Sequence, residues 1–263
     1  MKDLKEVLNN VKSWAKEVGK IQLEYLEKED LKINTKSSKV DLVTEVDELS
    51  EKYILDKIKK HYPDHKILSE ESGEIDLDSD YLWIIDPLDG TTNYAQGLPI
   101  FAISIALQHK GETLLGVVYL PKLDEMFEAL KDEGAYLNGK RINVSNKSNL
   151  QDCVLATGFP YDKRTHKDNN ANYFAHFVPK VRGLRRMGAA AYDLANVAAG
   201  RLDGFWEINL SPWDVAAGVL IIKEAKGKVI YLDDKRGISL VAGNKIVCKK
   251  VLNEIEMVNK RKM

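Results

Sequence analysis

Cysteine, long apolar runs and a surplus of either charge are all scarce in this chain of 263 residues. Its two cysteines, Cys153 and Cys248, lie far apart and lack metal-ligand spacing. This argues against a disulfide framework and favours reduced thiols in a cytosolic protein. No apolar run approaches the roughly 20 residues that span a bilayer, and the first residues lack the apolar core of a signal peptide. We therefore expect a cytoplasmic protein with no membrane partner.

Charge and histidine content exclude two further classes. Lys and Arg total 39 against 40 Asp and Glu, so no basic surplus attracts nucleic acid, and we expect no nucleic-acid partner. Among the five histidines, only His61 and His65 have helical ligand spacing, and Pro63 interrupts it, which argues against a zinc site. Arg185 and Arg186 can contact substrate or phosphate, or be structural or solvated.

Apolar periodicity predicts a layered α/β (α+β) fold with alternating helix and sheet layers. The region from about residue 100 to 137 is rich in strands and should be antiparallel. We expect a single domain, residues 1–263, with subdomains of about 1–145 and 146–263 that carry the metal and phosphate site and the substrate side, respectively. The predicted helices cover residues 4–25, 46–61, 166–181, 188–199, 212–225 and 244–260. The predicted strands cover residues 66–69, 81–86, 100–108, 113–120, 125–130, 134–137, 154–157, 203–208 and 228–232.

The segment from Asp86 to Tyr94 carries the strongest chemical signal. An apolar strand is predicted to end at Asp86, and Asp89 follows three residues later, so both carboxylates can point beyond the strand end. Gly90 allows close approach of a ligand to the backbone, and a short helix opening here offers free N–H groups to a phosphate. Carboxylates and phosphate are both anionic, so divalent cations are expected between them.

Alone, Asp86 and Asp89 are equally well explained as turn and capping residues. Three other acidic segments, each at a strand end or helix start, change that balance: Glu70 follows a strand, and Asp47 and Asp214 open helices. The aspartyl-phosphate phosphatases are disfavoured because their D-x-D-x-[TV] motif has a different spacing.

These segments resemble the inositol monophosphatase family, the magnesium-dependent, lithium-sensitive sugar phosphatases, and in particular its bacterial inositol-1-monophosphatase type. Residues 86–94 match D-P-[IL]-D-G-T-[TK]-N-[FY], and residues 213–218 match W-D-x-A-[AG]-[GA]. Residues 36–47 match K-S-S-x-x-D-L-V-T-x-x-D, and residues 69–72 match G-E-E-S with Ser69 replacing glycine. The resemblance covers nearly the whole chain and implies the sugar-phosphatase fold, with layers in the order αβαβα.

The resemblance also implies a role for each matching residue. Two or three Mg²⁺ ions per subunit would be bound by Glu70, Asp86, the Leu88 carbonyl, Asp89 and Asp214. Catalysis would use Asp47, Thr91 and Glu70, with Asp47 and Thr91 orienting and deprotonating the attacking water. Substrate contacts would come from Asp89, Gly90, Thr91, Thr92, Gly188, Ala189, Ala190 and Glu207, and Lys36 would lie on a loop that closes over the site.

The implied function is hydrolysis of myo-inositol 1-phosphate, or of a similar polyol or sugar monophosphate, by a homodimeric enzyme. Relatives with the same metal site hydrolyse fructose 1,6-bisphosphate, histidinol phosphate or 3′-phosphoadenosine 5′-phosphate. Glu207 favours monophosphates, because its charge would repel a second phosphate beside it. A non-catalytic binding or regulatory protein remains the alternative of another class, and it predicts at least one missing metal ligand.

Overall fold

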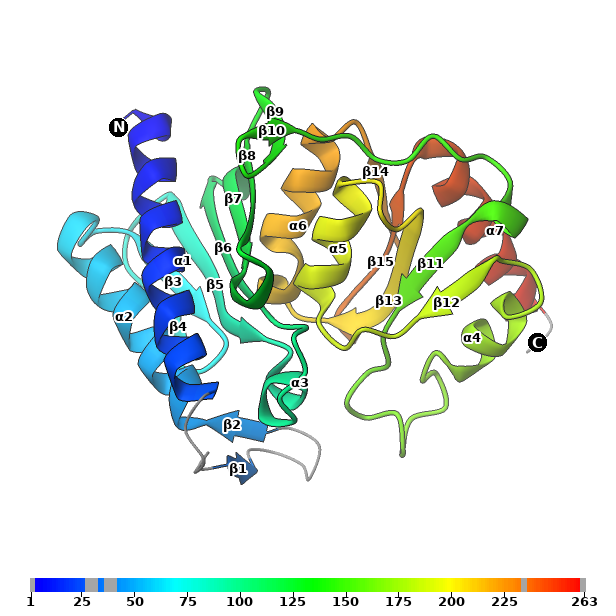
Figure 1. Ribbon diagram of the computed structural model, residues 1–263, viewed down its shortest axis with the longest axis horizontal. Helices are drawn as coiled ribbons and strands as arrows, with labels where there is room; N and C mark the ends of the chain where they lie inside the picture. Colours follow the sequence, from blue (N-terminus) through cyan, green and yellow to red (C-terminus); the bar gives the residue numbers. More distant parts are fainter. Residues whose placement is uncertain (1–2, 27–32, 36–41, 233–235, 261–263) are drawn as a thin grey trace.

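Five layers of alternating helices and sheets make up the protein (Figure 1). The computed structural model describes residues 3–26, 33–35, 42–232 and 236–260. The order of layers is the one that the sequence predicted, helix–sheet–helix–sheet–helix. No helix in the described part combines the length and hydropathy that a membrane span requires.

The first layer is a pair of helices, α1 (Leu4–Leu26) and α2 (Glu45–His61). In α1, residues such as Val7, Val11 and Val18 recur at steps of three and four and are buried against the first sheet. This apolar stripe is what fixes the helix on the sheet. A two-stranded hairpin, β1 (Ile33–Thr35) with β2 (Leu42–Thr44), lies beside this layer. Lys36 lies outside the described residues.

The first sheet has eight strands in the order β10-β9-β8-β7-β6-β5-β3-β4. Every pairing is antiparallel except that of β3 with β5, which is parallel. The antiparallel prediction for this region is therefore confirmed. The strands are β3 (Lys66–Ser69), β4 (Gly73–Ile75), β5 (Tyr81–Asp89), β6 (Ala102–His109), β7 (Glu112–Leu120), β8 (Glu125–Leu130), β9 (Gly134–Leu137) and β10 (Lys140–Arg141).

The middle layer consists of α5 (Ala190–Ala198) and α6 (Pro212–Glu224), which lie between the two sheets (Figure 1). Seven consecutive residues of α6 after Val215 are buried, as expected of a helix covered on all sides. Two glycines allow the close packing: a Cβ at Gly116 would lie 2.9 Å from the Ala217 carbonyl oxygen, and one at Gly218 would lie 2.7 Å from Leu194 Cβ.

The second sheet has the order β12-β11-β13-β15-β14. Its outer face is covered by α4 (Ala171–Phe177) and α7 (Lys245–Lys260), the last layer. Strand β11 is parallel to β12 and β13, whereas β15 is antiparallel to β13 and β14. The strands are β11 (Val154–Thr157), β12 (Gly183–Arg185), β13 (Gly204–Leu210), β14 (Lys228–Tyr231) and β15 (Ile238–Gly243).

The predicted secondary structure was wrong in several places, and the short strands β4, β10 and β12 were not predicted. The helix expected over 166–181 is only α4, seven residues long, because Asn170 adopts a left-handed conformation (φ 71°) before it. The Asn170 amide oxygen accepts a hydrogen bond from Trp206 Nε1 (2.7 Å), so tertiary contacts hold this segment. Strand β15 was missed altogether, and β5 continues past Asp86 to Asp89.

Candidate active site

The end of β5 presents two carboxylates by means of a bulge. Asp86 pairs with Ser104 and Asp89 with Ala102, so two residues of β5 oppose one of β6. Both carboxylates are buried, and the Asp86 side chain accepts a hydrogen bond from the Leu88 N–H (3.0 Å). The sequence predicted a strand that ends at Asp86, with both carboxylates pointing beyond its end, whereas the structure places both residues within β5, on either side of the bulge.

The next residues form a sharp turn into α3 (Thr91–Ala95), the short helix that the motif predicted. Gly90 has φ +93°, and a Cβ on it would lie 3.0 Å from the Ile100 carbonyl oxygen. The Thr91 hydroxyl donates to the Leu88 carbonyl (3.1 Å) and lies 3.4 Å from the Asp47 carboxylate, which comes from the first turn of α2. Thr92 is exposed on α3.

Asp89 connects the first sheet to the middle layer. Its carboxylate accepts hydrogen bonds from the backbone N–H groups of Ala190 (3.1 Å) and Ala191 (2.7 Å), at the start of α5. An anion is stabilised at a helix N-terminus by these free N–H groups and by the helix dipole. The contact places the 188–190 segment beside Asp89, although the two lie about a hundred residues apart.

A cavity of about 240 Å³ lies between these elements, and we call it the acidic cavity. It brings together side chains from β5, from the turn after β3 and from the first turn of α6, where Asp214 accepts a hydrogen bond from the Ser211 N–H (2.7 Å). Its lining comprises Glu70, Asp86, Leu88, Asp89, Gly90, Thr91, Tyr161, Ser211, Trp213 and Asp214.

Burial raises the pKa values of the aspartates in the acidic cavity. Burial, and then the charges of Glu70, Asp89 and Asp214, raise the pKa of Asp86 well above its ordinary value. Burial also raises the pKa of Asp214, with Asp89 the next cause. For Asp89, burial raises the pKa to about 6 against the opposing effect of the α5 N–H groups. For Asp86 and Asp214 the neighbouring carboxylates add to the effect of burial, whereas the charge of Arg186 partly opposes it at Asp89.

Carboxylate and carbonyl oxygens are the ligands that Mg²⁺ prefers, so the lining of the acidic cavity fits this ion in chemistry. Within the described ranges, however, no three His, Cys, Asp or Glu side chains are arranged to hold one ion. Asp89 and Asp214 are hydrogen-bonded to backbone N–H groups, as is Asp86 to the Leu88 N–H, and a carboxylate that accepts one such bond keeps further lone pairs for a cation.

Glu207 lies on β13, and it is buried but does not line the acidic cavity. Its carboxylate packs against Gly158, where an added Cβ would overlap it. Burial raises its pKa to about 8, and the positive charges of Arg186 and Lys163 partly oppose the shift. Burial therefore favours the protonated form of Glu207, and two positively charged side chains, Arg186 and Lys163, act on it.

Sequence reasoning missed several residues of the site. Trp213 lies within the quoted motif but was given no role, whereas the exposed Tyr161, in the loop after β11, gave no signal at all. Asn93 was also quoted without a role, and its amide donates to the carbonyls of Ile100 and Met187 (both 2.8 Å). Arg186, whose role stayed open, lies close enough to act electrostatically on Asp89 and Glu207.

Together, the five layers and the carboxylate-lined cavity beside a Gly-Thr turn define a layered α/β protein with an acidic site between its first sheet and its middle helices. Residues 3–260 match the Inositol monophosphatase family. The chain belongs to this family.

Individual relatives agree with the family assignment. The chain is 44% identical over 237 residues to a Nus factor SuhB of Pasteurella multocida, covering 88% of each chain. It is 41% identical over 221 residues to an inositol-1-monophosphatase of Mesorhizobium japonicum, covering 82% of this chain and 83% of that one. The structure of an inositol monophosphatase from Anabaena (Nostoc) sp. PCC 7120 superposes with a TM-score of 0.87, at 40% identity and with coverage of 97% and 96%.

Proposed function

We propose that this protein is a magnesium-dependent phosphomonoesterase that hydrolyses myo-inositol 1-phosphate or a similar small polyol phosphate. The observation that carries the proposal is the acidic cavity, in which four carboxylates converge beside the Gly90–Thr91 turn. Burying that many like charges destabilises a protein unless cations neutralise them. A phosphatase site that binds two or three Mg²⁺ ions accounts for this arrangement.

In this proposal the ions are held by Glu70, Asp86, the Leu88 carbonyl, Asp89 and Asp214. When bound, Mg²⁺ neutralises phosphate charge and lowers the pKa of a bound water. The family that this chain resembles is lithium-sensitive, so lithium should lower the magnesium-dependent rate of phosphate release.

The chain's own residues supply orientation and a proton acceptor. The Thr91 hydroxyl is fixed between the Leu88 carbonyl and Asp47. It is therefore placed to orient a water molecule, and the Asp47 carboxylate can take the proton as the water oxygen attacks phosphorus. The bond between phosphorus and the ester oxygen then breaks, and the leaving oxygen takes up a proton from solvent and departs as the alcohol. The Gly90–Thr92 backbone is proposed to hold the phosphate oxygens.

The substrate side is proposed to comprise Glu207 and the 188–190 segment. A protonated Glu207 can both donate to and accept from polyol hydroxyl groups, which supports an inositol-like alcohol. The same protonation weakens the repulsion of a second phosphate, and Arg186 and Lys163 lie close enough to act on Glu207. Fructose 1,6-bisphosphate therefore stays a serious second substrate, and histidinol phosphate a third.

A binding role is the second candidate, because the first relatives are named as Nus factors. A protein that only binds a partner does not need a complete set of converging carboxylates, and each of Glu70, Asp86, Asp89 and Asp214 is present. We therefore rank catalysis first and regard binding as an additional role. A homodimer is part of the proposal and is tested by light scattering on the purified protein.

The decisive experiment measures phosphate release from inositol 1-phosphate, fructose 1,6-bisphosphate, histidinol phosphate and glycerol 2-phosphate, with magnesium and with EDTA. We compare the wild type with Asp89→Asn and with Asp152→Asn, a control that removes an exposed carboxylate away from the cavity. We expect magnesium-dependent turnover that Asp89→Asn abolishes and Asp152→Asn retains. No turnover of any substrate by the folded wild type would refute the enzyme and place the binding role first.

A further inference from the structure

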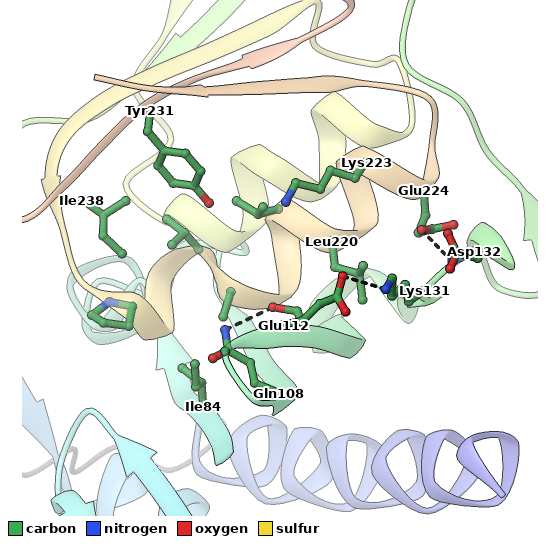
Figure 2. A pocket seen from close by; sticks show the side chains of 16 residues that line it. Ile84, Gln108, Glu112, Lys131, Asp132, Leu220, Lys223, Glu224, Tyr231 and Ile238 are labelled. Carbon is green, nitrogen blue, oxygen red and sulfur yellow. Dashed lines mark hydrogen bonds and ion pairs between the residues drawn. The ribbon is translucent and has the colours of Figure 1, made fainter. Parts of the chain in front are cut away.

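A second cavity, of about 440 Å³, lies against a different face of α6 from the acidic cavity (Figure 2). We call it the α6 cavity. It lies between α6, the β6–β7 hairpin and the strands β14 and β15. Its volume is within the range of small-molecule binding sites, about 300–1,000 Å³. None of its lining residues belongs to the candidate active site.

The floor of the α6 cavity is apolar. Ile84 from β5, Val215, Val219 and Leu220 from α6, and Ile238 from β15 contribute side chains to it. These residues come from both sheets and from the helix between them, so the floor is part of the rigid core. An alkyl or aromatic group can be buried there without leaving a polar group unpaired.

Most of the charged groups around this floor already have partners. Lys131 forms an ion pair with Glu112 (2.6 Å). Glu224 accepts hydrogen bonds from the backbone N–H groups of Asp132 (2.9 Å) and Gly134 (2.8 Å). These pairs lie at one end of the cavity in Figure 2. Glu224 and Asp132 make that end of the cavity acidic. The Lys131 ammonium there is paired with Glu112, so among the described lining residues it is not available to a ligand.

Two donors at the other end are available. Lys223 makes no ion pair or hydrogen bond with any residue in the described ranges, and it is exposed. In Figure 2 its ammonium group points towards the side of the cavity where Tyr231 lies, and the Tyr231 hydroxyl points in from the facing wall. An ammonium and a hydroxyl that line the same cavity beside an apolar floor are complementary to an anionic group on an apolar body.

We propose that the α6 cavity is a second binding site, for a small molecule with an apolar body and one carboxylate or phosphate group. The anion lies between Lys223 and Tyr231, and the body rests on Val219 and Ile238. The acidic end at Glu224 repels the anionic group and so fixes the orientation of the ligand in the α6 cavity. This role goes beyond phosphate hydrolysis and does not depend on it.

The first turn of α6 connects this site to the acidic cavity. Pro212 and Val215 line the α6 cavity, while Trp213 and Asp214 line the acidic cavity. The Trp213 carbonyl accepts a hydrogen bond from Ser104 on β6 (3.2 Å), so this turn is held against the first sheet. A ligand that contacts Pro212 and Val215 therefore acts on the turn that positions Asp214.

The test is a titration of the metal-free protein with 3-phenylpropionate, followed by NMR of the methyl and aromatic side chains. 3-Phenylpropionamide is the matched neutral probe. Lys223→Gln removes the ammonium, and Lys249→Gln removes an exposed lysine from α7 as the control variant. Binding is read directly, so its failure is distinguishable from a failure of the proposed phosphatase activity.

We expect 3-phenylpropionate to shift the signals of Ile84, Val219 and Tyr231 and the indole signal of Trp213. Lys223→Gln should weaken the affinity by about fivefold or more, the loss of one charge-assisted hydrogen bond. The amide should bind more weakly by a similar factor, and Lys249→Gln should change nothing. Equal binding of the amide, an unaffected Lys223→Gln variant, or no shifts at the α6 cavity at millimolar probe would overturn the proposal. An unshifted Trp213 would overturn the link between the cavities.

Discussion

Replacing Gly90 by alanine tests how tightly the turn at the site is built. Gly90 has a left-handed backbone (φ +93°), which costs about 1–2 kcal/mol for an L-residue. The new Cβ would also lie 3.0 Å from the Ile100 carbonyl oxygen and 3.1 Å from the Ala189 Cβ. Both neighbours are too close for normal packing, and the first is backbone. The turn between Asp89 and Thr91 must therefore shift.

Gly139 provides a matched control. It has a similar conformation (φ +74°), but a Cβ there meets nothing within 4 Å. Gly139→Ala should lower the free energy of unfolding by about 1–2 kcal/mol from backbone strain alone. Gly90→Ala carries the same strain and overpacking besides, for which about 1–3 kcal/mol is usual. We expect a total of about 2–5 kcal/mol for Gly90→Ala.

Urea unfolding gives both free energies, and magnesium-dependent phosphate release gives the effect on activity. The close contacts at Gly90 require its neighbours to move by a few tenths of an ångström. Because a displacement of about 1 Å at a reacting group costs roughly a hundredfold in rate, Gly90→Ala should lose turnover severalfold while Gly139→Ala keeps wild-type turnover. The reasoning is refuted if the two variants lose the same stability and Gly90→Ala stays active, because the close contacts would then have no consequence.

Three further predictions concern groups whose surroundings are unusual. Burial lowers the pKa of His65, whose Nδ1 accepts a hydrogen bond from Trp83 Nε1 (3.1 Å). The unfolded state therefore binds the proton more readily than the folded state, so the free energy of unfolding should fall as the pH drops through 6.5. Urea unfolding at several pH values measures this, and His65→Phe should show a flatter pH profile. The Ser69 hydroxyl is buried with no hydrogen-bond partner in the described part, so Ser69→Ala should raise the free energy of unfolding by about 1 kcal/mol in urea titrations, and a loss of that size would contradict this. Magnesium at about 100 times its Kd should add about 2.7 kcal/mol of stability in thermal unfolding. It should also release protons into weak buffer, because burial raises the pKa values of Asp86 and Asp214. EDTA should reverse both effects.

Much of the fold could be predicted from apolar periodicity, because α1, α2, α6 and α7 each have enough turns to show it. The missed strand β15 has buried residues on both faces, Ser239 to Gly243, so it lacks the alternation that marks a half-exposed strand. The helix expected over residues 166–181 was predicted too long, because the local pattern does not show the tertiary contacts of Asn170. Its polar spacing is compatible with a helix, but Asn170 is committed to Trp206 and Thr157, which no local pattern reveals.

For the site, the sequence located the carboxylates but not their present partners. The spacing of Asp86 and Asp89 predicted convergence, and the acidic cavity brings both together with Glu70 and Asp214. That Asp89 accepts the N–H groups of α5 depends on a helix about a hundred residues away. No local pattern in the sequence reveals this contact, because it depends on tertiary structure.

These backbone contacts have a consequence for how the site is assembled. Asp89 ties the first sheet to α5, and Asp214 caps α6 through Ser211, so two acidic side chains also hold the middle layer in place. Because an N-cap interaction and a carboxylate at a helix N-terminus each contribute about 1 kcal/mol, both aspartates are favourable locally even though burial raises their pKa values. Hydrogen bonds from the starts of α5 and α6 therefore offset part of the repulsion between the carboxylates in the acidic cavity. The first turn of α6 lines both the acidic cavity and the α6 cavity. We therefore expect a change at one cavity to reach the other through this turn.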